Sequence, residues 1–300
     1  MTVLAIDIGG TKFAAAVIDP QGAILARSEQ PVGSDPTATL TALIEAMTRP
    51  GLAAVGIGSA GPLQAGAGTV SPVNIPAWRD FPLVEVVAGL LPGLPVALAG
   101  DAQCMALGEW WKGGYERSSR ALLGIVVSTG IGGGLILDGR PYTGPTGNAG
   151  HIGHIVVDPA GDPCPCGATG CLETLASGPN MVRWAQARGW QGHDARQLAA
   201  DANTGEPVAL ATFRRSAQAL TAGIHTTATL LDVDDVVIGG GVAAAGPLLL
   251  TPLRQAVVAQ AGLDFAQRVR ISLTSLGREA GLFGAAALAY AHPALEPVPH

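Results

Sequence analysis

The chain has 300 residues, which is enough for one large domain or two modest domains with a sizeable core. Its composition is apolar and rich in alanine and glycine, which is typical of a well-packed globular protein and argues against disorder. The net charge of −6 leaves no basic surface for a nucleic acid, and Gly, Ser, Asp or Pro interrupts every apolar run before it reaches membrane-spanning length.

The N-terminal part of the chain predicts an α/β unit. Apolar runs in the first thirty residues, separated by a glycine pair and by Pro20-Gln21-Gly22, predict three short antiparallel strands. The hydrophobic spacing that follows predicts, in chain order, a helix at 37–48, a strand at 52–58, a helix at 84–93, a strand at 95–101 and a helix at 102–114.

The rest of the chain repeats this plan. Residues 121–142 again read strand, glycine-rich turn and strand, and this echo predicts two similar lobes around a ligand-binding cleft. The segments after them are predicted as a mostly helical stretch at 177–230, a strand–glycine–helix unit at 235–250, a strand at 269–277 and a buried helix at 279–293. We therefore assign residues 1–117, completed by a helix within 281–300, to an N-terminal lobe, and residues 118–280 to a C-terminal lobe.

Residues 154–171 are spaced like a metal site. Cys164, Cys166 and Cys171 follow His154 closely, and a Cys3His set forms a closed, structural zinc site. The alternatives are three reduced cysteines in a loop or one disulfide, although Cys164-Pro165-Cys166 is too cramped to bridge itself. The grouped cysteines, and an N-terminus without a basic region or a cleavage site, predict a cytoplasmic protein.

Three glycine clusters stand at the ends of predicted strands: residues 7–12 (DIGGTK), 128–134 (STGIGGG) and 239–241 (GGG). Glycine lets the backbone approach phosphate oxygens closely, and consecutive N–H groups form an anion-binding nest. None of the clusters matches a GxxxxGK[ST] loop or a GxGxxG fingerprint. Two equivalent clusters in two lobes favour a phosphate clamp, and the alternative is that each run is only a tight hairpin.

Asp101 stands where a predicted strand meets the helix at 102–114. A carboxylate at this place faces the cleft, where it would accept a hydroxyl proton during phosphoryl transfer. The same position suits a helix N-cap, and the two roles are compatible.

Together these motifs resemble the ROK family (repressors, open reading frames and sugar kinases) of the actin-like ATPase superfamily. The matching segments are AIDIGGTK, Asp101-Ala102 with ALGE, VSTGIGGG, GHIGH, CPCGATGCLE and VIGGGV, which run in this order from residue 3 to about residue 290. The cysteine-rich segment is highly specific, whereas glycine pairs alone are weak. The resemblance implies a two-lobed, ribonuclease H-like α/β fold with a central cleft and a small zinc knuckle.

The resemblance further implies an ATP-dependent sugar kinase that uses Mg²⁺, holds a structural Zn²⁺ and forms a homodimer. Asp101 resembles the general base of such enzymes. Contacts to nucleotide and phosphate are implied for Asp7 (near the Mg²⁺), Gly9, Gly10, Thr11, Lys12, Thr129, Gly130, Gly132, Gly239, Gly240 and Gly241. Contacts to the sugar are implied for Gly61, Asn74, Asp101, His151, His154 and Glu173, and His154 would also bind the zinc.

Two residues depart from the family pattern. Gly100 stands where sugar kinases of the family usually carry an asparagine that binds a sugar hydroxyl. His151 stands where many members carry glutamate, and in this it resembles the bacterial N-acetylmannosamine kinases. A ring with one donor and one acceptor suits an acetamido group better than a bare hydroxyl. The alternative is that His151 only packs against the knuckle.

The leading hypothesis is therefore ATP-dependent phosphorylation of the 6-hydroxyl of N-acetylmannosamine, as in sialic acid breakdown. Glucose or N-acetylglucosamine is the runner-up substrate within the same class. A transcriptional repressor would need a helix-turn-helix before the first strand, and this acidic chain begins directly with that strand. A sugar-binding sensor that has lost catalysis is the third hypothesis, supported by Gly100 and opposed by Asp101 and the two phosphate loops.

Overall fold

The computed structural model describes residues 1–260 and 262–292, in which two sheets have five strands each. The first sheet contains, in spatial order, β3 (Ile24–Pro31), β2 (Lys12–Ile18), β1 (Thr2–Ile8), β4 (Leu52–Ser59) and β7 (Val96–Gly100). Strands β1, β2 and β3 pair in antiparallel fashion, whereas β4 and β7 continue the sheet in parallel with β1. The three antiparallel strands predicted for the N-terminus are confirmed.

The second sheet has the same topology. It contains, in spatial order, β10 (Arg140–Tyr142), β9 (Ile131–Leu137), β8 (Ala121–Val127), β11 (Asp235–Gly239) and β12 (Arg270–Leu273). Strands β8, β9 and β10 are antiparallel, and β11 and β12 follow in parallel. The internal echo in the sequence is thus a repeated sheet. A short hairpin, β5 (Leu63–Gln64) with β6 (Thr69–Val70), lies outside both sheets.

Helices cover both sheets. In the first lobe, α1 (Pro36–Met47) and α2 (Leu83–Leu90) share a hydrophobic core with one face of the sheet, and α10 (Ala280–Tyr290) packs on the other. The helices of the second lobe are α4 (Leu172–Ala176), α5 (Gly178–Gln186), α6 (Ala195–Asn203), α7 (Pro207–Leu231), α8 (Pro247–Gln260) and α9 (Asp264–Gln267). In the described parts of the chain, no helix is both long enough and apolar enough to cross a bilayer.

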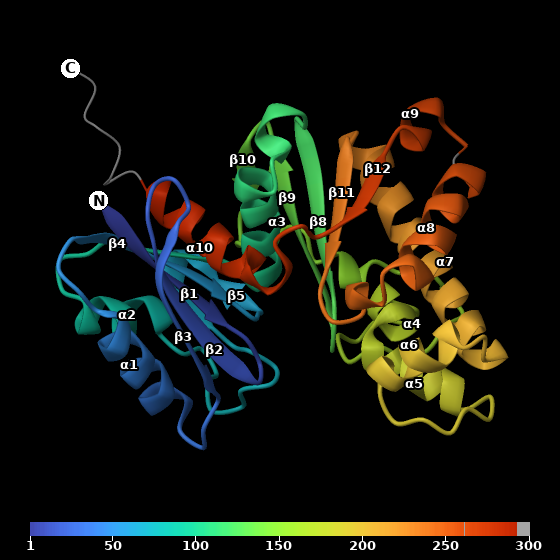
Figure 1. Ribbon diagram of the computed structural model, residues 1–300, viewed down its shortest axis with the longest axis horizontal. Helices are drawn as coiled ribbons and strands as arrows, with labels where there is room; N and C mark the ends of the chain where they lie inside the picture. The colour runs from blue at the N-terminus through green and yellow to red at the C-terminus, as the bar shows by residue number, and fades with distance from the viewer. Residues whose placement is uncertain (261, 293–300) are drawn as a thin grey trace.

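Two helices occupy the centre of the molecule, between the sheets: α3 (Asp101–Lys112) and α10 (Figure 1). They touch backbone to backbone, because a Cβ at Gly108 would overlap the Ala280 carbonyl and one at Gly284 would overlap that of Cys104. The helix expected within 281–300 is therefore α10, which is buried as predicted and ends at Tyr290; residues 293–300 lie outside the described part.

The start of α3 differs by one residue from the N-cap interpretation of Asp101. Strand β7 runs into the helix without a linking residue, so Gly100 is the N-cap and Asp101 is the first helical residue. The side chain of Gln103 takes the capping role instead, since its Oε1 accepts a hydrogen bond from the Gly100 N–H at 3.0 Å. The Asp101 carboxylate is thereby left at the very tip of the helix.

Candidate active site

Two carboxylates meet at the ends of two strands of the first sheet that are separated by a third strand. Asp7 belongs to the end of β1, and Asp101 follows β7, with β4 between them. Burial and then the charge of Asp101 raise the pKa of Asp7 to about 7, while Lys12 opposes the shift. Burial likewise raises the pKa of Asp101, although the Ala102 N–H donates to its Oδ1 at 2.7 Å. These carboxylates lie close enough to repel, which fits a pair that faces a cation.

His151 lies beside this pair. The imidazole lowers the pKa of Asp101, and in return Asp101 opposes the fall in the pKa of His151 that burial and His154 cause. The ring approaches the Gly61 turn, because a Cβ built on Gly61 would lie 3.8 Å from His151 Nε2. The rings of His151 and His154 are 6.2 Å apart between centroids. Four of the predicted sugar-site residues therefore form one group.

The first glycine cluster forms the turn between β1 and β2. The Gly9 N–H donates to the Lys12 carbonyl at 3.1 Å, which closes the turn. Asn74 covers it, since a Cβ on Gly10 would lie 2.7 Å from the Asn74 Cβ. The ammonium of Lys12 forms an ion pair with Glu29 at 2.9 Å. The structure thus places Asn74 against the predicted phosphate turn, whereas the Lys12 ammonium is paired with Glu29 of β3.

The second glycine cluster divides between a turn and a strand. Gly130 lies in the turn, where an added Cβ would lie 2.7 Å from Glu173 Oε2, and the same oxygen accepts from the Ile131 N–H at 2.7 Å. Gly132 instead lies within β9, opposite Val126. An added Cβ there would lie 2.9 Å from that of Ala102, so this glycine also makes room for α3, a packing role that the phosphate-loop interpretation left out.

The third cluster closes against the end of β8. Gly239 is the last residue of β11, and Gly240 has a φ of +92°. A Cβ on Gly240 would overlap the carbonyl of Val127, and the Val242 N–H donates to that same carbonyl at 3.0 Å. Only glycine satisfies both the backbone angle and the close approach. The turn after β11 is thereby pressed against the turn after β8.

A cavity of about 1280 Å³ opens beside these two turns. Three predicted residues line it, namely Thr129, Gly240 and Gly241, whereas Asp7, Asp101, His151 and His154 lie outside its lining. Thr129 is the neighbour in sequence of Gly130, which touches Glu173, so the cavity adjoins the sugar-site group. Its volume is sufficient for a nucleotide-sized ligand.

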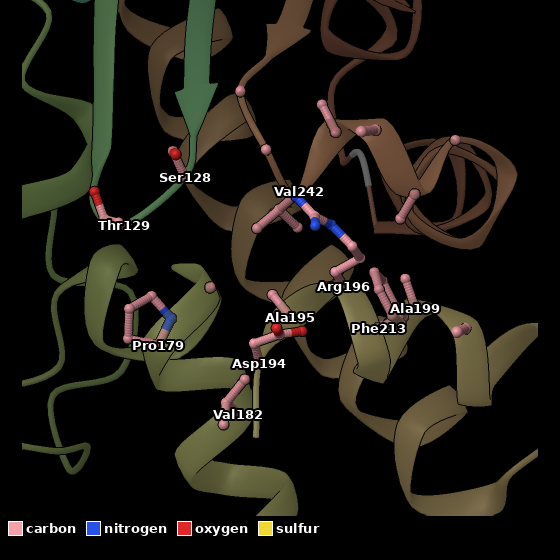
Figure 2. Close-up of a pocket in the computed structure, with 18 of the residues that line it drawn as sticks. Ser128, Thr129, Pro179, Val182, Asp194, Ala195, Arg196, Ala199, Phe213 and Val242 are labelled. Atoms are coloured by element: carbon pink, nitrogen blue, oxygen red, sulfur yellow. The ribbon is translucent and has the colours of Figure 1, made fainter. Parts of the chain in front are cut away.

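Most of the cavity wall was not predicted. Figure 2 shows Pro179 and Val182 from α5, Asp194, Ala195 and Arg196 at the start of α6, and Phe213 from α7 facing the ends of the strands. The cavity is also lined by Leu273 at the end of β12 and by Thr274, Gly277 and Arg278 in the segment after it. The side chain of Arg196 extends toward Val242 (Figure 2). No local motif marks these residues, because only the packing of separate segments brings them together.

The predicted zinc ligands come together. The ligand atoms of His154, Cys164, Cys166 and Cys171 all lie within 4.8 Å of one another. His154 Nδ1 is 3.7 Å from Cys164 Sγ, and Cys166 Sγ is 3.6 Å from Cys171 Sγ. Burial, followed by the hydrogen bond that the Cys171 thiol donates to Cys166, raises the pKa of Cys171 to about 12. Three thiolates so close together need a cation, and the set fits tetrahedral zinc.

The chain is similar to known proteins over almost its whole length. The model of the ROK family matches residues 3–292. An N-acetylmannosamine kinase of Shigella flexneri is 38% identical over 96% of this chain and 98% of its own length. A glucokinase of Streptomyces coelicolor is 35% identical over 95% of this chain and 96% of its own length.

A solved structure has the same fold. A ROK family glucokinase from Streptomyces griseus, determined in complex with glucose and AMPPNP, superposes with a TM-score of 0.82 at 33% identity. The likeness covers 96% of this chain and 99% of that one. It confirms the predicted two-lobed, actin-like α/β fold. The chain therefore belongs to the ROK family.

Proposed function

We propose that this ROK sugar kinase transfers the γ-phosphoryl group of ATP to the 6-hydroxyl of N-acetylmannosamine. The observation that carries the proposal is the half-buried Asp101 carboxylate, which lies near enough to both His151 and Asp7 for their charges to interact. This group lies next to a nucleotide-sized cavity lined by Thr129 and Gly241. Similarity to kinases over nearly the whole chain supports the same reaction class.

In the proposed reaction Asp101 accepts the proton of the sugar 6-hydroxyl while the oxygen of that hydroxyl attacks the γ-phosphorus of ATP. The new bond forms between that oxygen and phosphorus, the bond to the β–γ bridging oxygen breaks, and ADP leaves. Asp7 would hold Mg²⁺, whose charge, when the ion is bound, offsets that of the phosphates. The turns at Gly10 and Gly130 offer backbone N–H groups to the phosphate oxygens.

The sugar would lie between Asp101 and the knuckle. His154 turns its Nδ1 toward Cys164, so Nε2, on the opposite edge of the ring, points away from the zinc ligands and is free for a sugar hydroxyl. Glu173, tied to the Ile131 N–H, and Asn74 would contact further hydroxyls. Zinc bound here would have His154 and the three cysteines as ligands, so it would hold the pocket together and leave the chemistry to Asp101.

We expect the substrate preference to depend on His151. The replacement His151→Glu should lower the ratio of kcat/KM for N-acetylmannosamine to that for glucose by about tenfold, because a carboxylate cannot donate to an acetamido carbonyl. The measurement is coupled ADP release with N-acetylmannosamine, N-acetylglucosamine, glucose and mannose. The variant His151→Gln keeps one donor and one acceptor and is the control. A wild-type preference for glucose would support the runner-up glucokinase function instead.

Gly100→Asn is expected to strengthen hexose binding. The backbone at Gly100, with φ of −66° and ψ of 148°, suits any residue, and an added Cβ meets only the Gln103 side chain at 3.5 Å or more. The new amide would reach a sugar hydroxyl beside Asp101, so KM for the sugar should fall by about threefold or more. Gly100→Ala gives the same backbone restriction, worth about 0.5 kcal/mol of stability, without the amide. Equal KM values for the two variants would contradict the prediction.

A further inference from the structure

Glu109 is a fully buried carboxylate that the proposed reaction does not use. It lies on α3, two turns beyond Asp101, and binds the segment that follows β12. Its Oε1 accepts from the Thr274 hydroxyl and, at 3.1 Å, from the Leu276 N–H. Its Oε2 accepts from the Ser275 hydroxyl at 3.1 Å and from the Ser275 N–H at 3.4 Å.

This arrangement is built for a carboxylate. Both oxygens accept hydrogen bonds, and among the side chains that the structure describes no lysine or arginine forms an ion pair with Glu109. Gly113, just past the end of α3, leaves the space, because a Cβ there would overlap Glu109 Oε2. A buried charge without a cation is stabilised only by its donors, so the loop and the carboxylate hold each other in place.

The loop that Glu109 holds is a wall of the cavity. Thr274, Gly277 and Arg278 all line it. The Thr274 hydroxyl, which donates to Glu109, also accepts from the Gly277 N–H at 2.9 Å. Gly277 has a φ of +56°, and the bond from Thr274 fixes this left-handed turn just before Arg278. A short chain of hydrogen bonds thus runs from α3 to the cavity lining.

The far end of the same loop is tied to the first lobe. Glu279 forms an ion pair with Arg27 of β3 at 3.1 Å. Two residues later, Gly281 in the first turn of α10 lies beside Asp7, whose Oδ2 would lie 3.0 Å from an added Cβ. The loop therefore connects the cavity to both elements that carry the proposed catalytic carboxylates, α3 and β1.

We propose that Glu109 is a positioning residue that fixes the 274–278 wall of the nucleotide cavity to the helix carrying Asp101. The inference rests on the proposed function in taking this cavity as the nucleotide site. Because hydrogen bonds to Glu109 link this wall to α3, a nucleotide bound against Thr274 and Arg278 keeps a fixed position relative to the Asp101 carboxylate. Loss of the connection weakens nucleotide binding first, since the sugar-site residues lie elsewhere.

The test compares Glu109→Gln with Thr274→Val. In Glu109→Gln the NH2 group faces a backbone N–H in either orientation of the amide, that of Ser275 or that of Leu276. In Thr274→Val the hydroxyl that links Glu109 to Gly277 is removed, while the shape of the side chain is kept. Both variants should raise the Kd for ADP, titrated calorimetrically without sugar, by about tenfold, and leave KM for the sugar within about twofold. Thr274→Ser keeps the hydroxyl and should restore affinity. The double variant should be less than additive.

Leu107→Val is the control for simple destabilisation, because Leu107 lies on the same helix, in a core cluster with Leu122 and Val237 that contains none of the residues bound by Glu109. It should lower the melting temperature without changing the Kd for ADP. Amide exchange at Leu276 and Gly277 should accelerate in Glu109→Gln and not in Leu107→Val.

Two results would overturn the inference: equal losses of nucleotide and sugar affinity in Glu109→Gln, or an unchanged Kd for ADP. A wild-type protein that binds ADP but prefers another sugar would contradict the proposed substrate alone. A wild-type protein that binds no ADP would contradict both the phosphoryl donor and this role of Glu109.

Discussion

Replacing Asp101 by asparagine is expected to lower kcat by about 10²–10⁴-fold, the usual contribution of a positioned general base. The amide has nearly the same shape as the carboxylate, and its oxygen can still accept from the Ala102 N–H, so the tip of α3 should remain folded. It cannot take the proton of a sugar hydroxyl. Turnover should therefore fall while the affinity for sugar and nucleotide changes little.

Steady-state ADP release and a sugar titration by calorimetry together check this expectation. Asp138→Asn is a matched control, because Asp138 is an exposed residue after β9 whose partner is the equally exposed Arg120. Its kcat should equal that of the wild type. Activity of the Asp101→Asn variant equal to that of the wild type would contradict the assignment of the base.

The pH profile gives an independent check of Asp101. A general base works only in its ionised form, which is present above its pKa, so the rate falls as the pH is lowered through that value. Burial raises the pKa of Asp101 above that of an ordinary aspartate, so kcat/KM should begin to fall at a higher pH than an ordinary aspartate would give. In Asp101→Asn this limb should disappear from the residual rate.

The repeated sheets could be predicted because their signals are local. A strand, a glycine turn and a second strand occur at residues 1–18 and again at 121–137. The apolar runs and the turn residues within each segment are enough to predict it. The ligand spacing of the knuckle is equally local. The N-cap at Asp101 was misplaced by one residue, because the side chain that caps the helix is that of Gln103, two positions further on.

The cavity proposed for the nucleotide could not be predicted in the same way. Its wall combines α5, the start of α6, Phe213 and the loop at 274–278, and these segments meet only through tertiary packing. Glu109 was part of the quoted ALGE motif, yet its sequence neighbours give no sign of donors 165 to 167 residues away. The role of Gly132 beside α3 has no sequence signal of its own, because a glycine that makes room for a helix looks the same in sequence as one that makes room for a phosphate.

The knuckle carries two of the proposed sugar contacts, which makes metal removal a test of the pocket as well as of the fold. His154 is itself a proposed ligand, and Glu173 lies in α4, which begins directly after Cys171. Cys171 is fully buried, and its Sγ lies 3.6 Å from the His154 carbonyl. Loss of the ion would therefore release both sugar contacts at once.

Cys171→Ser is expected to abolish zinc binding, which metal analysis of the purified protein would register as a fall from about one ion per chain. The melting temperature should fall by roughly 10 °C, because a few kcal/mol of metal-linked folding energy is lost from a chain that keeps its main cores. KM for the sugar should rise by about tenfold or more, whereas the Kd for ADP should change much less, since the knuckle cysteines do not line the nucleotide cavity.

Cys104→Ser provides the control, because Cys104 is buried under the two carboxylates and takes no part in the ligand set. It should retain the full metal content. Chelation of the wild-type protein should reproduce the effects of Cys171→Ser and be reversed by added Zn²⁺. A metal-free protein with wild-type stability and sugar affinity would mean that the backbone alone, through bonds such as that from the Leu172 N–H to the Ile155 carbonyl at 2.9 Å, positions His154 and Glu173.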